Sequence, residues 1–179
     1  MSKRTALILL SGLLLALDTA MADVPSGYRQ VAQRTDVPAS ILYAIALAES
    51  GTRLASGQRR PWPWTLNIEG RGYRYRTRRA AWQSLRATLA RGVTRVDIGL
   101  MQVNWGYHHE ALGDAWQALD PYHNLSVGAA ILQTQHRIAG HWWRAVGRYH
   151  APNHPERAER YRSRVADWHG RVTRAGEPG

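Results

Sequence analysis

The pattern of apolar and polar positions predicts a chain made mainly of helices. Apolar residues recur at intervals of three and four in several segments, as they do on the buried face of an amphipathic helix. The predicted helices cover about residues 27–34, 39–50, 77–90, 124–139 and 142–150, and a last one starts at Pro155. Thr77 and Asn124 are predicted to cap the starts of their helices. The helices that they start are predicted to end at Gly92 and Gly140.

A small β-hairpin is predicted ahead of the helix that starts at Thr77. Residues 62–67 and 73–76 are expected to pair, because Gly70 and Gly72 between them permit a tight reversal of the chain. The predicted fold class is therefore mainly α, with a helical-bundle core and a small β-hairpin insert.

A lone carboxylate, Glu49, stands at the end of an apolar run that begins at Ile41. Ile41, Ile45 and Glu49 turn by only about 40° at each step of four residues, so Glu49 points with the apolar stripe. Gly51 can end the helix, which puts the carboxylate near the negative end of the helix dipole. Desolvation and the dipole both disfavour the anion, so we predict a raised pKa, suited to proton donation near neutral pH. The alternative is a glutamate that reaches water at a fraying helix end.

Two amide side chains, Gln102 and Asn104, stand at alternate positions after Gly99. In an extended stretch this spacing would aim both amides at one face. Amides can donate to and accept from hydroxyl and N-acetyl groups, which suits an uncharged, carbohydrate-like ligand. Gly99 would let backbone or sugar approach closely. The alternative is a buried turn whose amides satisfy local backbone groups.

These residues belong to an ordered set of four motifs. The set comprises Glu49-Ser50-Gly51, residues 99–104 (GLMQVN), residues 124–130 (NLSVGAA) and residues 145–149 (AVGRY). In this order the motifs resemble those of the soluble lytic transglycosylases, a family that resembles lysozyme in fold and cleaves the glycan strands of peptidoglycan. The resemblance runs from about Val24 to Tyr149 and implies an α+β lysozyme-like fold.

The resemblance also implies a mechanism with Glu49 as the catalytic residue. Glu49 would protonate the leaving oxygen of the β-1,4 bond between N-acetylmuramic acid and N-acetylglucosamine. It would then act as base on the C6 hydroxyl of the muramic acid, which closes a 1,6-anhydro ring without consuming water. The Tyr149 hydroxyl would orient Glu49 or an acetamido group of the substrate. The residues implied to bind substrate are Ser50, Gly99, Met101, Gln102, Asn104, Tyr149 and His150.

The chain departs from the family pattern in ways that bear on its partners. A long insert, about residues 52–97, replaces the usual short link between the first two motifs. The usual Tyr-Asn-Ala-Gly is Tyr149-His150-Ala151-Pro152, so the role of the asparagine does not carry over to His150. Residues 61–70 and the Tyr149-His150 pair resemble the subgroup found with conjugative elements and secretion or pilus systems. Such an assembly is therefore a predicted partner.

Two other functions remain open at this point. A lysozyme-type hydrolase of the same glycan would need a second carboxylate beside a water, and Asp97 is the nearest candidate in the sequence. A capping or pairing role at the exit of the hairpin is the simpler expectation for Asp97. The other alternative is a non-catalytic peptidoglycan-binding adaptor, which would not need Glu49 in an apolar stripe.

The N-terminus predicts export. Lys3 and Arg4 precede an apolar stretch over residues 6–17, and Ala20-Met21-Ala22 supplies a cleavage site, so residues 1–22 are predicted to be a cleaved signal peptide. A retained signal anchor is the alternative. The sequence has no cysteine, which excludes a lipoprotein anchor and disulfides. We expect a periplasmic protein with one domain over residues 23–175 and a flexible tail over residues 176–179.

The formal net charge of +11 and the pI of about 11.0 indicate attraction to a polyanion. Basic residues interleave with apolar helix positions over residues 71–95 and 157–174 and do not gather on one motif-bearing face. We therefore expect the partner to be the glycan strands of peptidoglycan, with no nucleic acid and no stable membrane insertion. The chain is expected to act as a monomer.

The eight histidines do not form a metal-binding pattern. His108-His109-Glu110 differs from the His-Glu-x-x-His helix motif, and Pro152 separates His150 from His154. No metal and no cofactor are expected.

Overall fold

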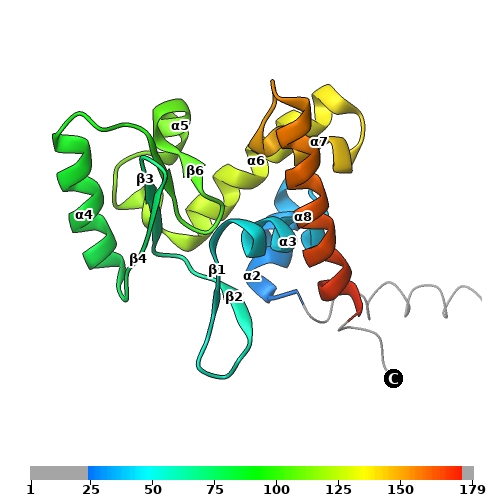
Figure 1. The fold of residues 1–179 in the computed structure, drawn as a ribbon, viewed down its shortest axis with the longest axis horizontal. Helices are drawn as coiled ribbons and strands as arrows, with labels where there is room; N and C mark the ends of the chain where they lie inside the picture. The colour runs from blue at the N-terminus through cyan, green and yellow to red at the C-terminus, as the bar shows by residue number, and fades with distance from the viewer. Residues whose placement is uncertain (1–23, 175–179) are drawn as a thin grey trace, which may run out of the picture.

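The computed structural model describes residues 24–174. The predicted signal peptide and the predicted tail lie outside the described residues. Figure 1 shows two groups of elements, with the helices around α3 on one side and the sheet strands with α4 and α5 on the other. The helices are α2 (Ser26–Thr35), α3 (Ala39–Ser50), α4 (Arg78–Ala90), α5 (Trp105–Leu112), α6 (Pro121–Ala139), α7 (Trp142–His150) and α8 (Pro155–Arg174).

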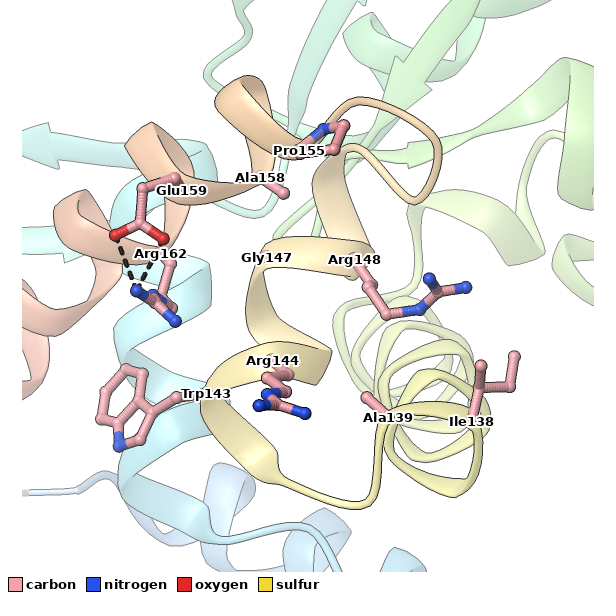
Figure 2. A pocket seen from close by; sticks show the side chains of 10 residues that line it. All are labelled: Ile138, Ala139, Trp143, Arg144, Gly147, Arg148, Pro155, Ala158, Glu159 and Arg162. Atoms are coloured by element: carbon pink, nitrogen blue, oxygen red, sulfur yellow. Dashed lines mark hydrogen bonds and ion pairs between the residues drawn. The ribbon is translucent and has the colours of Figure 1, made fainter.

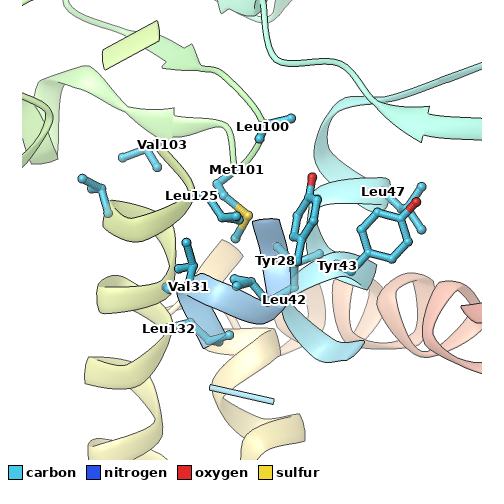
Figure 3. Packing of buried hydrophobic residues seen from close by; sticks show 14 of the residues in the cluster. Tyr28, Val31, Leu42, Tyr43, Leu47, Leu100, Met101, Val103, Leu125 and Leu132 are labelled. Carbon is cyan, nitrogen blue, oxygen red and sulfur yellow. The ribbon is translucent and has the colours of Figure 1, made fainter. Parts of the chain in front are cut away.

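Helix α3 is the buried centre of the helical group. Nine of its twelve residues are buried, so the helix is enclosed on most sides and does not carry a single apolar stripe. It packs against α2 and α8 and contributes Leu42 and Ile45, both fully buried. Figure 3 shows Met101 and Leu125 reaching into the same cluster as Leu42. The last turn of α3 is thereby held rigidly at the junction of the two groups.

The sheet is antiparallel, with strand order β4-β3-β5-β6. Glu69 and Gly70 form its two-residue reversal, and both have positive φ, at 52° and 89°. A two-residue turn of this kind matches the right-handed twist of the paired strands. The hairpin was therefore predicted at the right place, although its strands begin and end elsewhere. The observed strands are β3 (Thr65–Ile68), β4 (Arg71–Arg74), β5 (Val96–Ile98) and β6 (Val103–Asn104).

The predicted insert holds more than a hairpin. β1 (Gly51–Arg53) pairs with β2 (Arg59–Pro61) as a separate two-stranded sheet. Helix α4 follows β4, and the Thr77 hydroxyl caps it by accepting a hydrogen bond from the Ala80 N–H at 3.2 Å. This cap and the end of the helix before Gly92 were both predicted. Strands β1, β2, β5 and β6, helix α5 and the 3-10 turn η1 (Gln117–Leu119) were not predicted.

The predicted start of α6 is wrong. Asp120 caps this helix, because its carboxylate accepts hydrogen bonds from the N–H groups of Tyr122 and His123 at 3.1 and 3.0 Å. Pro121 occupies the first position, where its missing N–H costs nothing. Asn124 lies inside the helix and is buried. The predicted end is correct, since Gly140 follows the helix in the left-handed conformation.

Helices α7 and α8 form a hairpin, and α8 packs on α3. The linker between them contains Pro152, and α8 begins at Pro155, as predicted. Tyr161 and Val165 of α8 are buried against the core, and α8 packs along α3. The fold is thus mainly α with a small antiparallel sheet, which confirms the predicted class. Within residues 24–174, none of the helices combines the length and the apolar character needed to cross a bilayer.

Candidate active site

Glu49 occupies the last turn of α3, where α7, α8 and the sheet come together. Its side chain is 13% exposed, and its Oε1 lies 3.9 Å from Nδ1 of His150. Burial raises the pKa of Glu49 from 4.5 to about 7, while Tyr161 and Arg164 lower that pKa. The direction agrees with the prediction, and burial is the main cause. A mostly buried carboxyl also argues against a glutamate that merely reaches water at the helix end.

Tyr161 and His150 form one wall beside this carboxyl. Their rings stack in parallel, with centroids 4.4 Å apart and 1° between the planes. The guanidinium of Arg164 lies over the Tyr161 ring at 5.0 Å. The Tyr161 hydroxyl is buried and lacks a well-aligned hydrogen-bond partner. It is nevertheless close enough to Glu49 that each group shifts the pKa of the other. Burial and the neighbouring Glu49 raise the pKa of Tyr161 well above 10.

The facing wall is the turn formed by residues 99–102 between β5 and β6. Gly99 and Gln102 have φ values of 80° and 47°, so this segment is a tight turn and the predicted extended stretch is wrong. The Gln102 Nε2 donates to the carbonyl oxygens of Gly99 and Thr65, at 2.9 and 3.3 Å. Gln102 thus satisfies local backbone groups, as in the alternative considered for these amides.

Three side chains from three helices hold the turn in place. The Ser50 hydroxyl donates to the Leu100 carbonyl at 2.8 Å, and the Tyr149 hydroxyl donates to the Met101 carbonyl at 2.8 Å. From α6, the Asn124 Oδ1 accepts from the Met101 N–H at 3.0 Å. The turn therefore has its backbone groups fixed from α3, α7 and α6 at once.

Gly99 lies directly against the side-chain amide of Asn124. The Asn124 Nδ2 also donates to the carbonyl oxygens of Ile98 and Ala118, at 2.9 and 3.2 Å. A Cβ placed on Gly99 would lie only 2.5 Å from the Asn124 Cγ. Gly99 is therefore required for a close approach, but the approaching group is the Asn124 side-chain amide and not the backbone or sugar that was expected.

A row of polar side chains crosses the sheet beside the turn. Asn67, Asp97 and Asn104 are register neighbours on β3, β5 and β6. The Asp97 carboxylate accepts from the amides of Asn104 and Asn67, at 2.7 and 3.1 Å. Burial raises the pKa of Asp97, and these two bonds lower it. Asp97 has the pairing role that was the simpler expectation, since each of its oxygens accepts an amide.

A family model described as the transglycosylase SLT domain matches residues 27–169. The chain belongs to this family. The members of the SLT domain family are lytic transglycosylases that act on peptidoglycan, and the match confirms the resemblance at the level of the family. No curated protein and no solved structure matches the chain.

In this SLT domain, the structure brings most of the predicted site residues together. Glu49 and His150 approach each other directly, while Ser50, Tyr149 and Met101 meet through the turn. Asn104 is one step removed, because its amide is bound to Asp97.

Sequence reasoning missed several residues of this candidate site. Tyr161 was given no role beyond its place in the last predicted helix, and Asn124 was assigned to a helix cap and to the third family motif. Arg164 and Asn67 were not singled out. A tyrosine among the apolar positions of the last helix was an available signal, because a buried hydroxyl needs a partner. Arg164 and Asn67 are linked to the site only by the fold.

A pocket on the helical hairpin lies apart from this site. It has a volume of about 370 Å³ and lies where α6, α7 and α8 meet (Figure 2). None of the predicted site residues lines it. Its polar lining includes Arg144, Arg148 and Arg162, and Arg162 is paired with Glu159.

No metal-binding group stands out in the part of the chain that the structure describes. Within residues 24–174, no three histidine, aspartate or glutamate side chains are placed to hold one ion.

Proposed function

We propose that this SLT domain is a peptidoglycan lytic transglycosylase and that Glu49 is its catalytic acid. The observation that carries the proposal is the mostly buried Glu49 carboxyl, which lies where the helices meet the turn. Its pKa is raised to about 7. A carboxyl with this pKa keeps a large protonated fraction near neutral pH and can still release its proton. Such a group suits a reaction that needs an acid first and a base afterwards.

The reaction uses a single carboxylate. Glu49 gives its proton to the glycosidic oxygen between N-acetylmuramic acid and N-acetylglucosamine as the C1–O bond breaks. The C6 oxygen of the muramic acid then bonds to C1 and gives its proton to the Glu49 carboxylate, which yields the 1,6-anhydro product and restores the acid. A substrate-supplied nucleophile removes the need for a second protein carboxylate.

The remaining residues shape the glycan cleft in this proposal. Ser50 and Tyr149 act by fixing the carbonyl groups of the turn, and the buried Gly99 and Met101 keep the turn in its shape. Gln102 and Asn104 offer the unused hydrogen-bonding capacity of their amides to sugar groups. His150, which is 44% exposed, contacts the muramic acid residue.

A lysozyme-type hydrolase is the second candidate, and the state of Asp97 argues against it. A hydrolase would need a second carboxylate that holds a water, whereas Asp97 is engaged by the side-chain amides of Asn67 and Asn104 in the sheet. The adaptor alternative has less support, because a binding module gains nothing from a desolvated carboxyl, which costs stability.

The proposal extends to where the enzyme works. Export through the predicted signal peptide would put it in the periplasm, beside its substrate. The resemblance of residues 61–70 and of Tyr149-His150 to the subgroup of conjugative elements supports a role in opening the wall locally for a conjugation, secretion or pilus apparatus. In a host with such an apparatus, we expect Glu49→Gln to lower the assembly of that apparatus.

Mass spectrometry of peptidoglycan digests tests the activity. Purified peptidoglycan is digested with the mature protein and, in parallel, with Glu49→Gln. We expect anhydro-ended fragments from the native protein alone. Fragments heavier by one water would move the assignment to a hydrolase. Pelleting with the wall without any fragments would favour the adaptor.

A further inference from the structure

The pocket on the helical hairpin is a hollow lined at its base by small residues. Gly147 lets α7 and α8 approach closely, because a Cβ on Gly147 would lie 3.0 Å from the Ala158 carbonyl oxygen and 3.2 Å from the Ala158 Cβ. Ala139, the last residue of α6, lines the same hollow, and longer side chains stand around it (Figure 2). Its volume of about 370 Å³ lies within the range of pockets that bind ligands, roughly 300–1,000 Å³.

Positive charge dominates the lining of this pocket. Arg144, Arg148 and Arg162 line it together with one acid, Glu159, which leaves two net positive charges. Arg162 is paired with Glu159 at 2.6 Å, and the Arg148 Nε donates to the Gln135 amide oxygen at 3.0 Å. Arg144 is exposed, and in the part of the chain that the structure describes it has no hydrogen bond or ion pair. Its guanidinium is therefore available to a carboxylate from another molecule.

Apolar side chains stand beside the free arginine. Figure 2 shows Arg144 between Trp143 and Ile138. Ile138 is 62% exposed, and Trp143 is only partly buried against the core. A ligand gains free energy by covering this apolar surface with an apolar group of its own. Tryptophan and arginine are also enriched among the residues that carry the binding energy of protein–protein interfaces.

The pocket and the candidate active site use different faces of α7. Val146 is buried in the core, and the Tyr149 hydroxyl binds the turn beside Glu49. Arg144 and Arg148 lie one helical turn apart on another face of the helix. At 100° per residue, Arg144 and Tyr149 point about 140° apart. A ligand in the pocket therefore leaves the proposed glycan cleft free.

We propose that this pocket is a docking site for an acidic segment of a protein partner, in which carboxylates flank a large apolar side chain. The apolar side chain packs between Ile138 and Trp143. One flanking carboxylate binds the fork of N–H groups on Arg144 in a bidentate manner, and a second pairs with Arg148. The peptide carboxylates of the cell wall would satisfy the arginines, but a large apolar side chain is needed to cover Ile138 and Trp143 as well. Docking here is independent of the proposed transglycosylase activity.

Fluorescence anisotropy with a labelled peptide tests this docking site. The blocked peptide has four glutamates around a central leucine, and a matched peptide has glutamines in place of the glutamates. We expect Arg144→Glu to weaken binding of the acidic peptide by about 10-fold. Arg79→Glu on α4 is the matched control, because it makes the same change of charge at another exposed arginine. Ile138→Ser leaves the charge unchanged and should weaken binding by about 5-fold through lost apolar contact.

The location of the bound peptide is read from amide signals in an NMR titration. The signals of Gly147 and Ala158 at the base of the pocket should shift when the acidic peptide binds, and should not shift with the glutamine peptide. Fragment release from peptidoglycan by Arg144→Glu should equal that of the native protein, because Arg144 lies outside the proposed cleft. Melting curves followed by circular dichroism show whether each variant keeps its fold.

Four results would overturn the docking site. Equal weakening by Arg144→Glu and Arg79→Glu would show that the peptide follows the net charge of +11 and not the pocket. An acidic peptide that fails to bind, or binds no better than the glutamine peptide, would remove the acidic partner. A soluble stem peptide of peptidoglycan that displaces the acidic peptide would assign the pocket to the wall, as would a loss of fragment release in folded Arg144→Glu. A native protein that releases no anhydro-ended fragments would refute the proposed function and leave the docking site standing.

Discussion

The Tyr149 hydroxyl donates a hydrogen bond of 2.8 Å to the carbonyl oxygen of Met101. The bond joins the last turn of α7 to the turn of residues 99–102, which are 48 positions apart in the sequence. Met101 also has its N–H bound by Asn124, so its peptide groups are fixed from two helices. This turn, the proposed wall of the glycan cleft beside Glu49, is thus held by tertiary contacts.

Replacing Tyr149 with phenylalanine should weaken this wall. The change leaves the Met101 carbonyl without its donor, which should lower the free energy of unfolding by about 1 kcal/mol. Activity should fall by about 10-fold, because a shift of part of an ångström at the wall misplaces the sugar. Urea denaturation and fragment release measure the two effects. Tyr107→Phe is the control, since Tyr107 is 86% exposed. An unchanged rate in Tyr149→Phe would remove this residue from the site.

Glu49→Gln should change stability in a pH-dependent way. The folded-state pKa of about 7 lies above the ordinary value of 4.5, so the native state holds the proton more tightly than the unfolded chain. Glu49 therefore costs stability progressively as pH rises from about 4.5 to about 7. The variant should match the native protein near pH 4 and be more stable above pH 7, by on the order of 3 kcal/mol at most.

Thermal melting across this pH range checks the prediction for Glu49. The control is Glu110→Gln, because Glu110 is exposed and should show no such divergence. Parallel melting curves for Glu49→Gln and the native protein at every pH would mean that Glu49 is not desolvated in solution.

Arg164→Gln should move the alkaline limb of the pH–rate profile. Arg164 lowers the pKa of Glu49, so its removal raises that pKa. The alkaline limb, where Glu49 loses the proton that it donates, should therefore shift to higher pH. Arg160→Gln on the same helix is the control, since Arg160 is exposed and pairs with Glu156. A profile that stays in place, measured by fragment release, would show that Arg164 does not act on the site.

The fold was largely predictable where local signals determine it. The Thr77 cap and the left-handed Gly140 act within one turn of helix, so sequence alone is sufficient for them. The start of α6 was predicted wrongly because Asp120 followed by Pro121 is an equally local cap signal, whereas Asn124 is engaged by the turn. Long-range contacts decide such cases.

The candidate site was likewise predictable only where a local sequence signal marks a residue. Glu49 is conspicuous as a carboxylate in an apolar run, and burial does raise its pKa. The turn at Gln102 was mistaken for an extended stretch, because a positive φ at a non-glycine residue is imposed by neighbours and not by the sequence. Tyr161 and Arg164 face Glu49 only after α8 folds back over α3.

Gly99→Ala should damage the site more than its backbone angle alone would suggest. Gly99 has a φ of 80°, and an added Cβ would meet the Asn124 Cγ at 2.5 Å. Gly57 provides a matched control, because its φ is 82° and nothing lies within 4 Å of its Cβ position. Gly57→Ala should cost only the left-handed strain, about 1 kcal/mol.

Gly99→Ala carries the same strain plus a clash with a buried amide that makes three hydrogen bonds. The clash should add about 1–3 kcal/mol, because either the turn or Asn124 must move in a packed interior. The difference between the two variants in urea denaturation isolates that contribution. Asn124→Ala in the Gly99→Ala background should then cost less than Asn124→Ala alone, since the clash and the amide occupy the same space. Equal costs for Gly57→Ala and Gly99→Ala would show that the turn yields freely and is not held by Asn124.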